Sequence, residues 1–467
     1  MYDLLVRNAL LVRPGRGVTE GNIAVKDGLI ADIGDEVDGE ATRVIDGEGL
    51  HVFPGVIDPH THPGLVAPLE RRLPLESRGA AAGGVTTLIS YIRRPEDYRN
   101  SVPARRASAE EHLLQDFAFH VTLLNERHLD DIDMCVREFG VTSFKIYMNS
   151  RMPLSERMRM DALPGQQLND IAAVDYDDGF LLKAFRSLAD HPGVRLNIHC
   201  ENSDIAIAET ARVIEQGREG LAAWSESRPS IGEAVAIHTA AVMSREFGVP
   251  LYIPHVGSRT GLEAVREIKQ LGTPVIVETC PHYLVLTDDA DPAAKVSPPI
   301  RTPGDQKAAI EAVATGLVDT LGSDEIPYTR EEKGMSTFWT ENTAFSGCGL
   351  LLPVAITSGL PLEAVARATS EGPARAFGLF PRKGSLEPGC DADFAVVDVH
   401  SEREVRPAEL VSSSDFSVYD GMALRGWPTL TVSRGDVIFD RGAFPARHGR
   451  GRYLFRTAEG LAGHGRA

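Results

Sequence analysis

Short apolar runs alternate with longer amphipathic stretches through the middle of the chain. The runs are almost continuous in apolar and β-branched residues, which is typical of parallel strands buried on both faces. Eight such runs can be counted, at 52–58, 85–91, 117–124, 141–148, 194–199, 250–255, 274–279 and 318–324. The stretches between them, such as 232–248 and 261–272, end in glycine, as helices often do. The alternation, more than the count, predicts an α/β fold with a (β/α)8 TIM barrel.

Both ends of the chain have a different pattern. Short alternating strands there are separated by Gly, Asp and Asn, as in hairpins. We therefore predict a small β-sandwich domain built from residues 1–52 and 378–467, with the barrel formed by residues 53–377 inserted between them. One connection inside the barrel, 149–179, is unusually long and polar. Such a segment is either a functional lid or a plain surface excursion.

Composition and charge narrow the class of protein. Of the 467 residues, 43% are hydrophobic and 24% are charged, as in ordinary soluble globular proteins. With 48 basic and 66 acidic residues the net charge is −18, which disfavours binding to nucleic acid or to an anionic membrane surface. No apolar run is long enough to span a membrane, and the N-terminus does not resemble a signal peptide. The five cysteines are scattered singly, which indicates buried thiols in a reducing cytoplasm rather than disulfides.

Residues that can bind metal ions gather where the predicted strands end. His60 and His62 follow the first run, Lys145 lies in the fourth, and His199, His255 and Asp324 end the fifth, sixth and eighth. Active sites of such barrels lie at the carboxyl ends of the strands, and imidazole and carboxylate groups suit zinc and similar metals. Taken singly, each histidine could be a hydrogen-bonded structural residue and Asp324 a helix cap. Their common placement predicts a hydrolytic site with two metal ions.

Lys145 is unusual because it lies inside an apolar strand. Desolvation and nearby cations lower the pKa of a buried amine, and a neutral amine can react with carbon dioxide to form a carbamate. The two oxygens of a carbamate can bridge two divalent metals. The alternative is a lysine that pairs with an acid or extends to solvent.

The order of several motifs resembles that of the cyclic amidohydrolases, which include dihydropyrimidinase/hydantoinase, allantoinase and dihydroorotase within the amidohydrolase superfamily. The resemblance covers essentially the whole chain. It rests on VFPGVIDPHTHPG, SFKIYM, NIHCEN, YIPHVGS, ETCPHYL, SPPIR and GSDEIPYT, and on the C-terminal EGPARAFGL, KGSLEPGCDADFAVVD and GRGRYLFR.

The resemblance implies roles for the residues at the strand ends. His60, His62 and Asp324 would bind one metal, His199 and His255 the other, and carboxylated Lys145 would bridge them. Asp324 would also transfer the proton to the leaving nitrogen when a cyclic amide or imide ring opens. Zinc is the expected metal, although manganese, cobalt or iron can occupy such sites. The resemblance further implies a homotetramer or dimer.

The resemblance also suggests residues that bind the substrate. Ser297 matches the position whose backbone contacts the cyclic amide in hydantoinases, and Asn202 and His282 lie in motifs near the pocket. The remaining candidates are Tyr147, Glu325 and Gly347.

This chain departs from the family's pattern around the substrate. No arginine follows His62 closely, which counts against a dihydroorotase, and Ser150 stands where hydantoinases have a tyrosine. Glu325 replaces a common histidine; it would disfavour an anionic substrate group or bind a cationic one, unless it turns outward. Gly349 replaces a glutamate. We therefore expect a substrate other than a standard pyrimidine, hydantoin or allantoin. Hydrolysis of an acyclic amide or carbamate and a non-catalytic scaffold remain as alternatives.

Overall fold

The computed structural model describes residues 1–63, 69–94, 96–149, 176–334 and 337–457. Eight parallel strands form one sheet in the order β13-β12-β11-β10-β9-β8-β7-β6. They are β6 (Val56–Thr61), β7 (Val85–Ile92), β8 (Asp116–Thr122), β9 (Ser143–Tyr147), β10 (Arg195–His199), β11 (Leu251–Ile253), β12 (Val275–Thr279) and β13 (Thr320–Leu321). A parallel bridge between Thr61 and Glu325 brings the first strand next to the segment that follows the last, which makes the sheet a nearly closed barrel.

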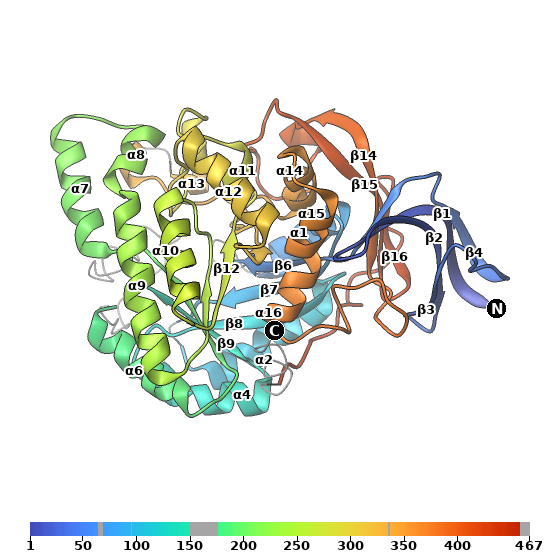
Figure 1. Cartoon of the computed structure of the whole chain (residues 1–467), viewed down its shortest axis with the longest axis horizontal. Helices are drawn as coiled ribbons and strands as arrows, with labels where there is room; N and C mark the ends of the chain where they lie inside the picture. The colour runs from blue at the N-terminus through green and yellow to red at the C-terminus, as the bar shows by residue number, and fades with distance from the viewer. Residues whose placement is uncertain (64–68, 95, 150–175, 335–336, 458–467) are drawn as a thin grey trace.

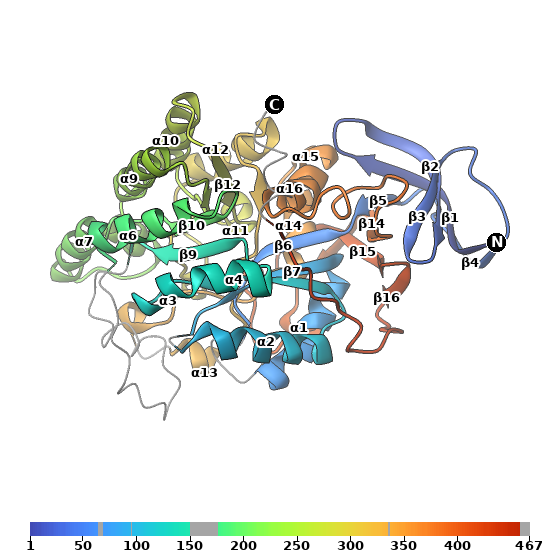
Figure 2. The same cartoon turned by 90° about the horizontal axis from the view of Figure 1, so that it is seen from below.

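Helices lie around the barrel, as Figures 1 and 2 show. The longer ones are α1 (Leu69–Ala82), α2 (Tyr98–His112), α4 (Ile132–Phe139), α6 (Asp178–Ala189), α9 (Ser230–Phe247), α10 (Arg259–Gln270) and α12 (Pro303–Thr315). Two more follow β10, namely α7 (Ser203–Glu215) and α8 (Leu221–Ser227), and α14 (Leu351–Thr357), α15 (Leu362–Ala366) and α16 (Gly372–Ala376) follow β13. The apolar faces of these helices and the strands share one large buried core. The predicted (β/α)8 fold is confirmed.

The two ends of the chain build a second sheet, seen on the right of Figure 1. Its strand order is β16-β15-β14-β5-β1-β2-β3, and β4 pairs with β1. The strands are β1 (Tyr2–Arg13), β2 (Gly17–Lys26), β3 (Leu29–Gly34), β4 (Ala41–Asp46), β5 (His51–Pro54), β14 (Phe394–Glu404), β15 (Ala423–Ser433) and β16 (Asp436–Asp440). Strand β5 pairs in parallel with β1 and in antiparallel fashion with β14, so this mixed sheet needs both ends of the chain.

The first predicted strand, 52–58, proves to be parts of two strands. Strand β5 ends at Pro54 in the terminal sheet, and β6 begins at Val56 in the barrel. Proline has no N–H with which to continue a ladder. A side chain at Gly55 between them would collide with that of Thr86. The apolar run therefore changes sheets within a few residues. The boundaries predicted for the two domains stay a prediction.

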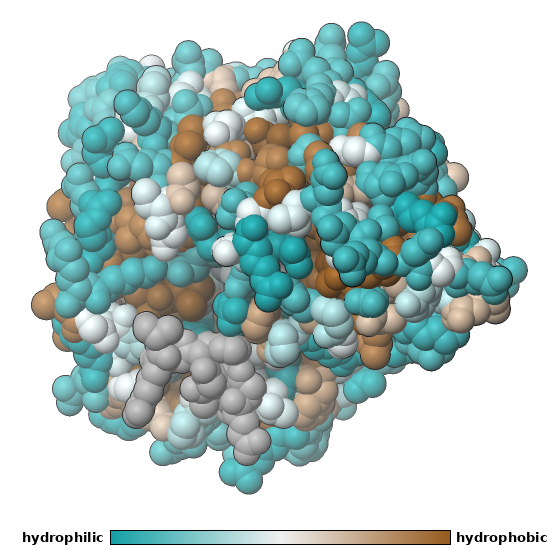
Figure 3. All heavy atoms as spheres, turned by 45° about the vertical axis from the view of Figure 1, so that its right-hand side comes forward, coloured by the Kyte–Doolittle hydropathy of each residue, from teal (hydrophilic) through white to brown (hydrophobic). Residues whose placement is uncertain are grey.

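Among the described residues, no helix is long and apolar enough to cross a membrane. On the face shown in Figure 3, hydrophilic side chains predominate and apolar ones gather in separate areas. All five cysteines are free and buried. Most of the segment 149–179, for which a lid was considered, falls outside the described residues, as does Ser150.

Candidate metal centre at the mouth of the barrel

The barrel brings the six predicted metal ligands to the carboxyl end of its strands. His60 lies in β6, Lys145 in β9 and His199 at the end of β10. His62, His255 and Asp324 follow β6, β11 and β13. The backbone of His255 and that of Asp324 are left-handed, with φ of 46° and 53°. Such conformations cost energy in residues other than glycine and occur often at functional sites.

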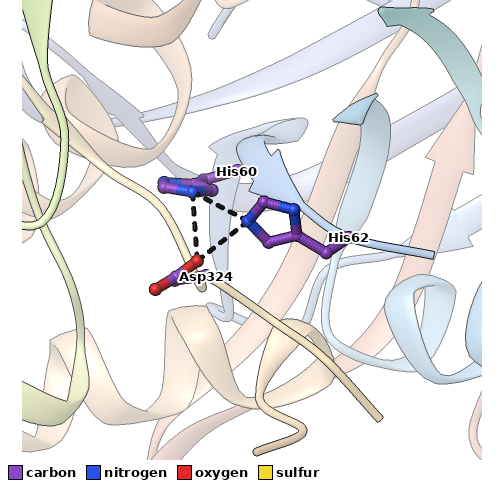
Figure 4. Close-up of side chains that lie close together, drawn as sticks. All are labelled: His60, His62 and Asp324. Atoms are coloured by element: carbon purple, nitrogen blue, oxygen red, sulfur yellow. Dashed lines mark hydrogen bonds and ion pairs between the residues drawn. The ribbon is translucent and has the colours of Figure 1, made fainter. Parts of the chain in front are cut away.

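Three of these side chains converge on a point (Figure 4). The Nε2 atom of His60 lies 3.0 Å from Oδ1 of Asp324 and 3.1 Å from Nε2 of His62. The Nε2 atom of His62 lies 3.1 Å from the same Oδ1. A carboxylate oxygen and two ring nitrogens at these distances form the donor set expected for one metal ion.

The charge around His60 also favours a cation at this point. Burial opposes its protonation, but the carboxylates of Glu278 and Asp324 outweigh burial and raise the pKa of His60 to about 9. Burial lowers the pKa of His62 to about 4, although Asp324 acts in the opposite direction. The two carboxylates therefore favour a positive charge at His60, which a metal ion could supply in place of the proton.

A buried carboxylate fixes the orientation of His60. Its Nδ1 lies 2.6 Å from Oε1 of Glu278, whose Oε2 accepts a hydrogen bond of 2.6 Å from the Tyr252 hydroxyl. With the proton on Nδ1, the lone pair of Nε2 faces His62 and Asp324. Carboxylates that hold metal-binding histidines in this way tune both their orientation and their basicity.

His199 and His255 form a second group. Their ring centroids lie 4.4 Å apart, and that of His255 lies 5.5 Å from His60. The Nε2 atom of His199 lies 2.6 Å from Oε2 of Glu201, which also accepts a 2.9 Å hydrogen bond from the Ser297 hydroxyl. Glu201 therefore holds His199 as Glu278 holds His60.

Lys145 lies between the two groups along the sheet. Its side chain is fully buried, and its Nζ has no hydrogen-bond partner among the described residues. The Nζ atom lies 5.3 Å and 5.0 Å from the ring centroids of Tyr91 and Tyr147. Burial lowers the pKa of the amine to about 8, against the pull of Asp324 and Glu278. A buried amine without a partner costs free energy unless another group completes the site.

A cavity of about 150 Å³ opens onto these residues. His60, His62, His199, His255 and Asp324 line it together with Tyr147 and Ser297. Two arginines, Arg93 and Arg228, also line it, beside Asn149, Trp224, Ile326, Tyr328, Asn342, Thr343 and Ala344.

Four predicted substrate residues lie elsewhere. The Asn202 side chain caps α7 by accepting a hydrogen bond of 3.0 Å from the N–H of Ile205. His282 is buried, and its ring packs against those of Tyr283 and Phe345. The carboxylate of Glu325 turns away from the metal ligands and accepts hydrogen bonds from the N–H groups of Gly347 and Cys348, at 3.0 and 2.5 Å.

A larger cavity of about 480 Å³ lies between α1 and the C-terminal strands. It is lined by Glu325, Gly347 and Gly349, and by none of the six predicted metal ligands. The smaller cavity is therefore the one at which chemistry is expected.

Four residues of this site were not among those predicted from the sequence. Glu278 could have been found as an acid within an apolar strand, and Glu201 as an acid close to His199. Arg93 follows β7 and obeys the same strand-end rule as the histidines. Arg228 follows α8, and no pattern in the sequence marks it.

Convergent histidines, an aspartate and a buried lysine at the mouth of a parallel barrel are the arrangement typical of metal-dependent hydrolases. The chain belongs to the Amidohydrolase family, whose model matches residues 51–438. The family predicted from the motifs is thus confirmed, and so is the prediction of an enzyme.

Known relatives match nearly the whole chain. It is 32% identical to the L-hydantoinase of Paenarthrobacter aurescens, over 98% of this chain and 98% of the relative. It is also 32% identical to the allantoinase of Deinococcus radiodurans, over 97% and 98%. Among solved structures, L-hydantoinase (dihydropyrimidinase) from Arthrobacter aurescens has a TM-score of 0.86 and 31% identity, with 97% of this chain and 99% of that chain covered. A D-hydantoinase has a TM-score of 0.85 and 26% identity, with 98% and 99% covered.

Proposed function

We propose that the protein is a binuclear-metal hydrolase that opens the ring of a cyclic amide or imide. The observation that carries this proposal is the convergence of His60, His62 and Asp324 within 3.1 Å, beside a buried Lys145 that has no hydrogen-bond partner in the described part of the chain. Relatives named hydantoinase and allantoinase support the choice of a cyclic amide.

Two divalent ions, zinc by the nature of the donors, would be held by residues of this chain. His60, His62 and Asp324 would hold one, and His199 and His255 the other. Lys145 would bridge them as a carbamate: Nζ forms a bond to the carbon of carbon dioxide and releases a proton. Its pKa of about 8 leaves a substantial share of the amine neutral near physiological pH, as this reaction requires. When bound, the ions would supply Lewis acidity toward the amide carbonyl and activate water for attack.

The side chains would then orient the substrate and move the proton. The backbone of Ser297 would hold the ring, and Tyr147 would form part of the cavity wall. Asp324 would accept a proton from the attacking water through its carboxylate and deliver it to the ring nitrogen as the C–N bond breaks. The products would be an open-chain ureido or amido acid. From the free, buried cysteines and the family we propose a cytoplasmic homotetramer or dimer.

The test is a panel of cyclic ureides, imides and lactams, with acyclic amides beside them. The protein would be loaded with zinc, manganese or cobalt in bicarbonate. We expect ring opening and two bound metal ions per chain. His62→Ala should lose the activity and the bound metal, whereas His238→Ala, which changes an exposed histidine of α9, should keep them. Metal-loaded protein that opens no ring would contradict the proposal. Efficient turnover of 5,6-dihydrouracil would contradict our expectation of an unusual substrate.

A further inference from the structure

The described wall of the metal-site cavity carries more positive than negative charge. Among its lining residues in the described part of the chain are two arginines, Arg93 and Arg228, and one acid, Asp324, which is a predicted metal ligand. The whole chain, in contrast, has a net charge of −18 and repels anions at long range. Two arginines in the cavity of such an acidic protein suggest that the cavity binds an anionic group.

Arg228 is held rigidly against an aromatic ring. Its guanidinium carbon lies 3.3 Å from the ring centroid of Trp224. Trp224 is itself fixed, because its Nε1–H donates a hydrogen bond of 2.7 Å to the carbonyl of Val296. Stacking of this kind orients the planar fork of an arginine before a ligand arrives, so little side-chain entropy is lost on binding.

The charge of Arg228 is not neutralised by a direct ion pair. Nη1 donates a hydrogen bond of 2.8 Å to the Ser227 hydroxyl, and no carboxylate in the described part of the chain lies within ion-pair distance. The acid that influences it, Glu201, is committed to His199 and Ser297. Burial lowers the pKa of Arg228 to about 10, so the guanidinium remains protonated near neutral pH. A partly buried guanidinium without a carboxylate partner is stabilised when a ligand brings one.

Arg93 adds a second cation on the wall of the cavity. It follows β7, and its guanidinium carbon lies 5.1 Å from the ring centroid of Tyr147, which also lines the cavity. Glu325, the residue that could have repelled an anion, turns its carboxylate toward Gly347 and Cys348 instead. The side chains that face the cavity therefore favour an anion.

We propose that the substrate is a cyclic amide that carries a carboxylate on its ring substituent, and that Arg228, assisted by Arg93, is the residue that selects it. A carboxylate matches the two parallel N–H donors of a guanidinium, whereas a neutral substituent would leave the cation unpaired. The inference rests on the proposed function for the ring-opening reaction, but the recognition of the carboxylate can be tested without turnover.

The experiment compares two hydantoins of nearly the same shape, 5-(carboxymethyl)hydantoin and 5-(carbamoylmethyl)hydantoin, which differ in the charge of the side group. We expect the metal-loaded enzyme to have a kcat/KM about 10- to 100-fold higher for the acid, the range of a charge-assisted hydrogen bond. Arg228→Gln should abolish this preference by lowering the value for the acid while changing that for the amide less than about threefold. Arg228→Lys should retain part of it, and Arg186→Gln, at an exposed position of α6, should retain all of it.

Binding measured by calorimetry provides the readout that does not depend on catalysis. The inference would be supported if the acid binds more tightly than the amide and if Arg228→Gln loses this difference. This would hold even if neither ring opens, in which case only the proposed function would fail. Equal kcat/KM and equal affinity for the two compounds in the wild-type protein would overturn it. So would parallel losses for both compounds in Arg228→Gln, or failure of both to bind. If Arg228→Gln does not fold, Arg228→Lys and the wild-type ratio still decide.

Discussion

Glu278 offers a sharp test of the proposed metal centre, because it contacts the predicted metal ligands without being one of them. Its Oε1 lies 2.6 Å from Nδ1 of His60 and also accepts a hydrogen bond of 3.3 Å from the N–H of His255. Its Oε2 accepts hydrogen bonds from Tyr252, whose hydroxyl also lies 2.9 Å from that of Thr320. Glu278→Gln keeps the shape of this side chain and removes its charge.

The size of the effect follows from these contacts. A glutamine can turn its oxygen to His60 and its NH₂ group to Tyr252, whose hydroxyl can then donate to Thr320 instead. The bond to His60 survives but loses the assistance of a charge, which is worth about 1 to 1.5 kcal/mol. Since 1.4 kcal/mol is a factor of ten, we expect metal affinity to fall about tenfold, near the lower end of the range for such partners.

The assay is competition for zinc between the protein and a chromophoric chelator, in bicarbonate buffer. Tyr252→Phe is the control, since it removes a hydroxyl from the same carboxylate but leaves the charge, and it should weaken binding less than Glu278→Gln. The metal-free Glu278→Gln protein should unfold at a lower temperature than the wild type, because Glu278 is one of the two carboxylates that stabilise protonated, buried His60. Unchanged zinc affinity in Glu278→Gln would refute the reasoning.

Three further predictions concern other parts of the site. Lys145→Ala should lose bound metal and activity, and small carboxylic acids should restore part of both; full activity without rescue would rule out a carbamate bridge. Gly322→Ala should lower metal affinity at least as much as Glu278→Gln, because the new Cβ would lie 2.8 Å from Cβ of His60 and would collide with the carboxylate of Glu278. A zinc affinity equal to that of the wild type in the chelator titration would contradict this. Burial lowers the pKa of His282 to about 3 in the folded protein, whereas the unfolded chain binds a proton at this histidine once the pH falls below about 6.5. The contribution of this group should therefore lower the free energy of unfolding by about 1.4 kcal/mol per pH unit between about pH 6.5 and pH 3. Between pH 7.5 and pH 5.5, denaturant unfolding should show that the free energy of unfolding falls by about 1.4 kcal/mol less in His282→Phe than in the wild type. Equal losses in the two proteins would show that His282 does not cause the pH dependence.

That the proposed metal ligands lie together at one end of the barrel could be predicted from the sequence for a simple physical reason. Parallel strands of a barrel all end at the same face, so residues such as His199 and Asp324 meet there however far apart they lie in the chain. The terminal sheet was also predictable from the alternating pattern of its strands. The change of sheets at Pro54 was not, because an apolar run does not reveal which sheet it joins.

The substrate side of the site was less predictable. Asn202 and Glu325 lie close in sequence to metal ligands, yet one caps a helix and the other binds the backbone of a neighbouring loop. The direction of a side chain in a loop depends on its packing, which periodicity does not encode. Arg228 shows the reverse: it reaches the cavity from the end of α8, outside any strand.

The terminal sheet has a consequence for how the protein is made. Strands β1 and β2 can form a hairpin as soon as they leave the ribosome, but β5 must wait for β14, which begins at Phe394. Until then one edge of β5, from His51 to Pro54, has no partner strand and is open to pairing with other chains. Closing a contact of this sequence separation is slow, and the nascent chain would remain prone to aggregation throughout. Synthesis of the protein should therefore depend on chaperones more than that of a barrel with its strands in sequence order.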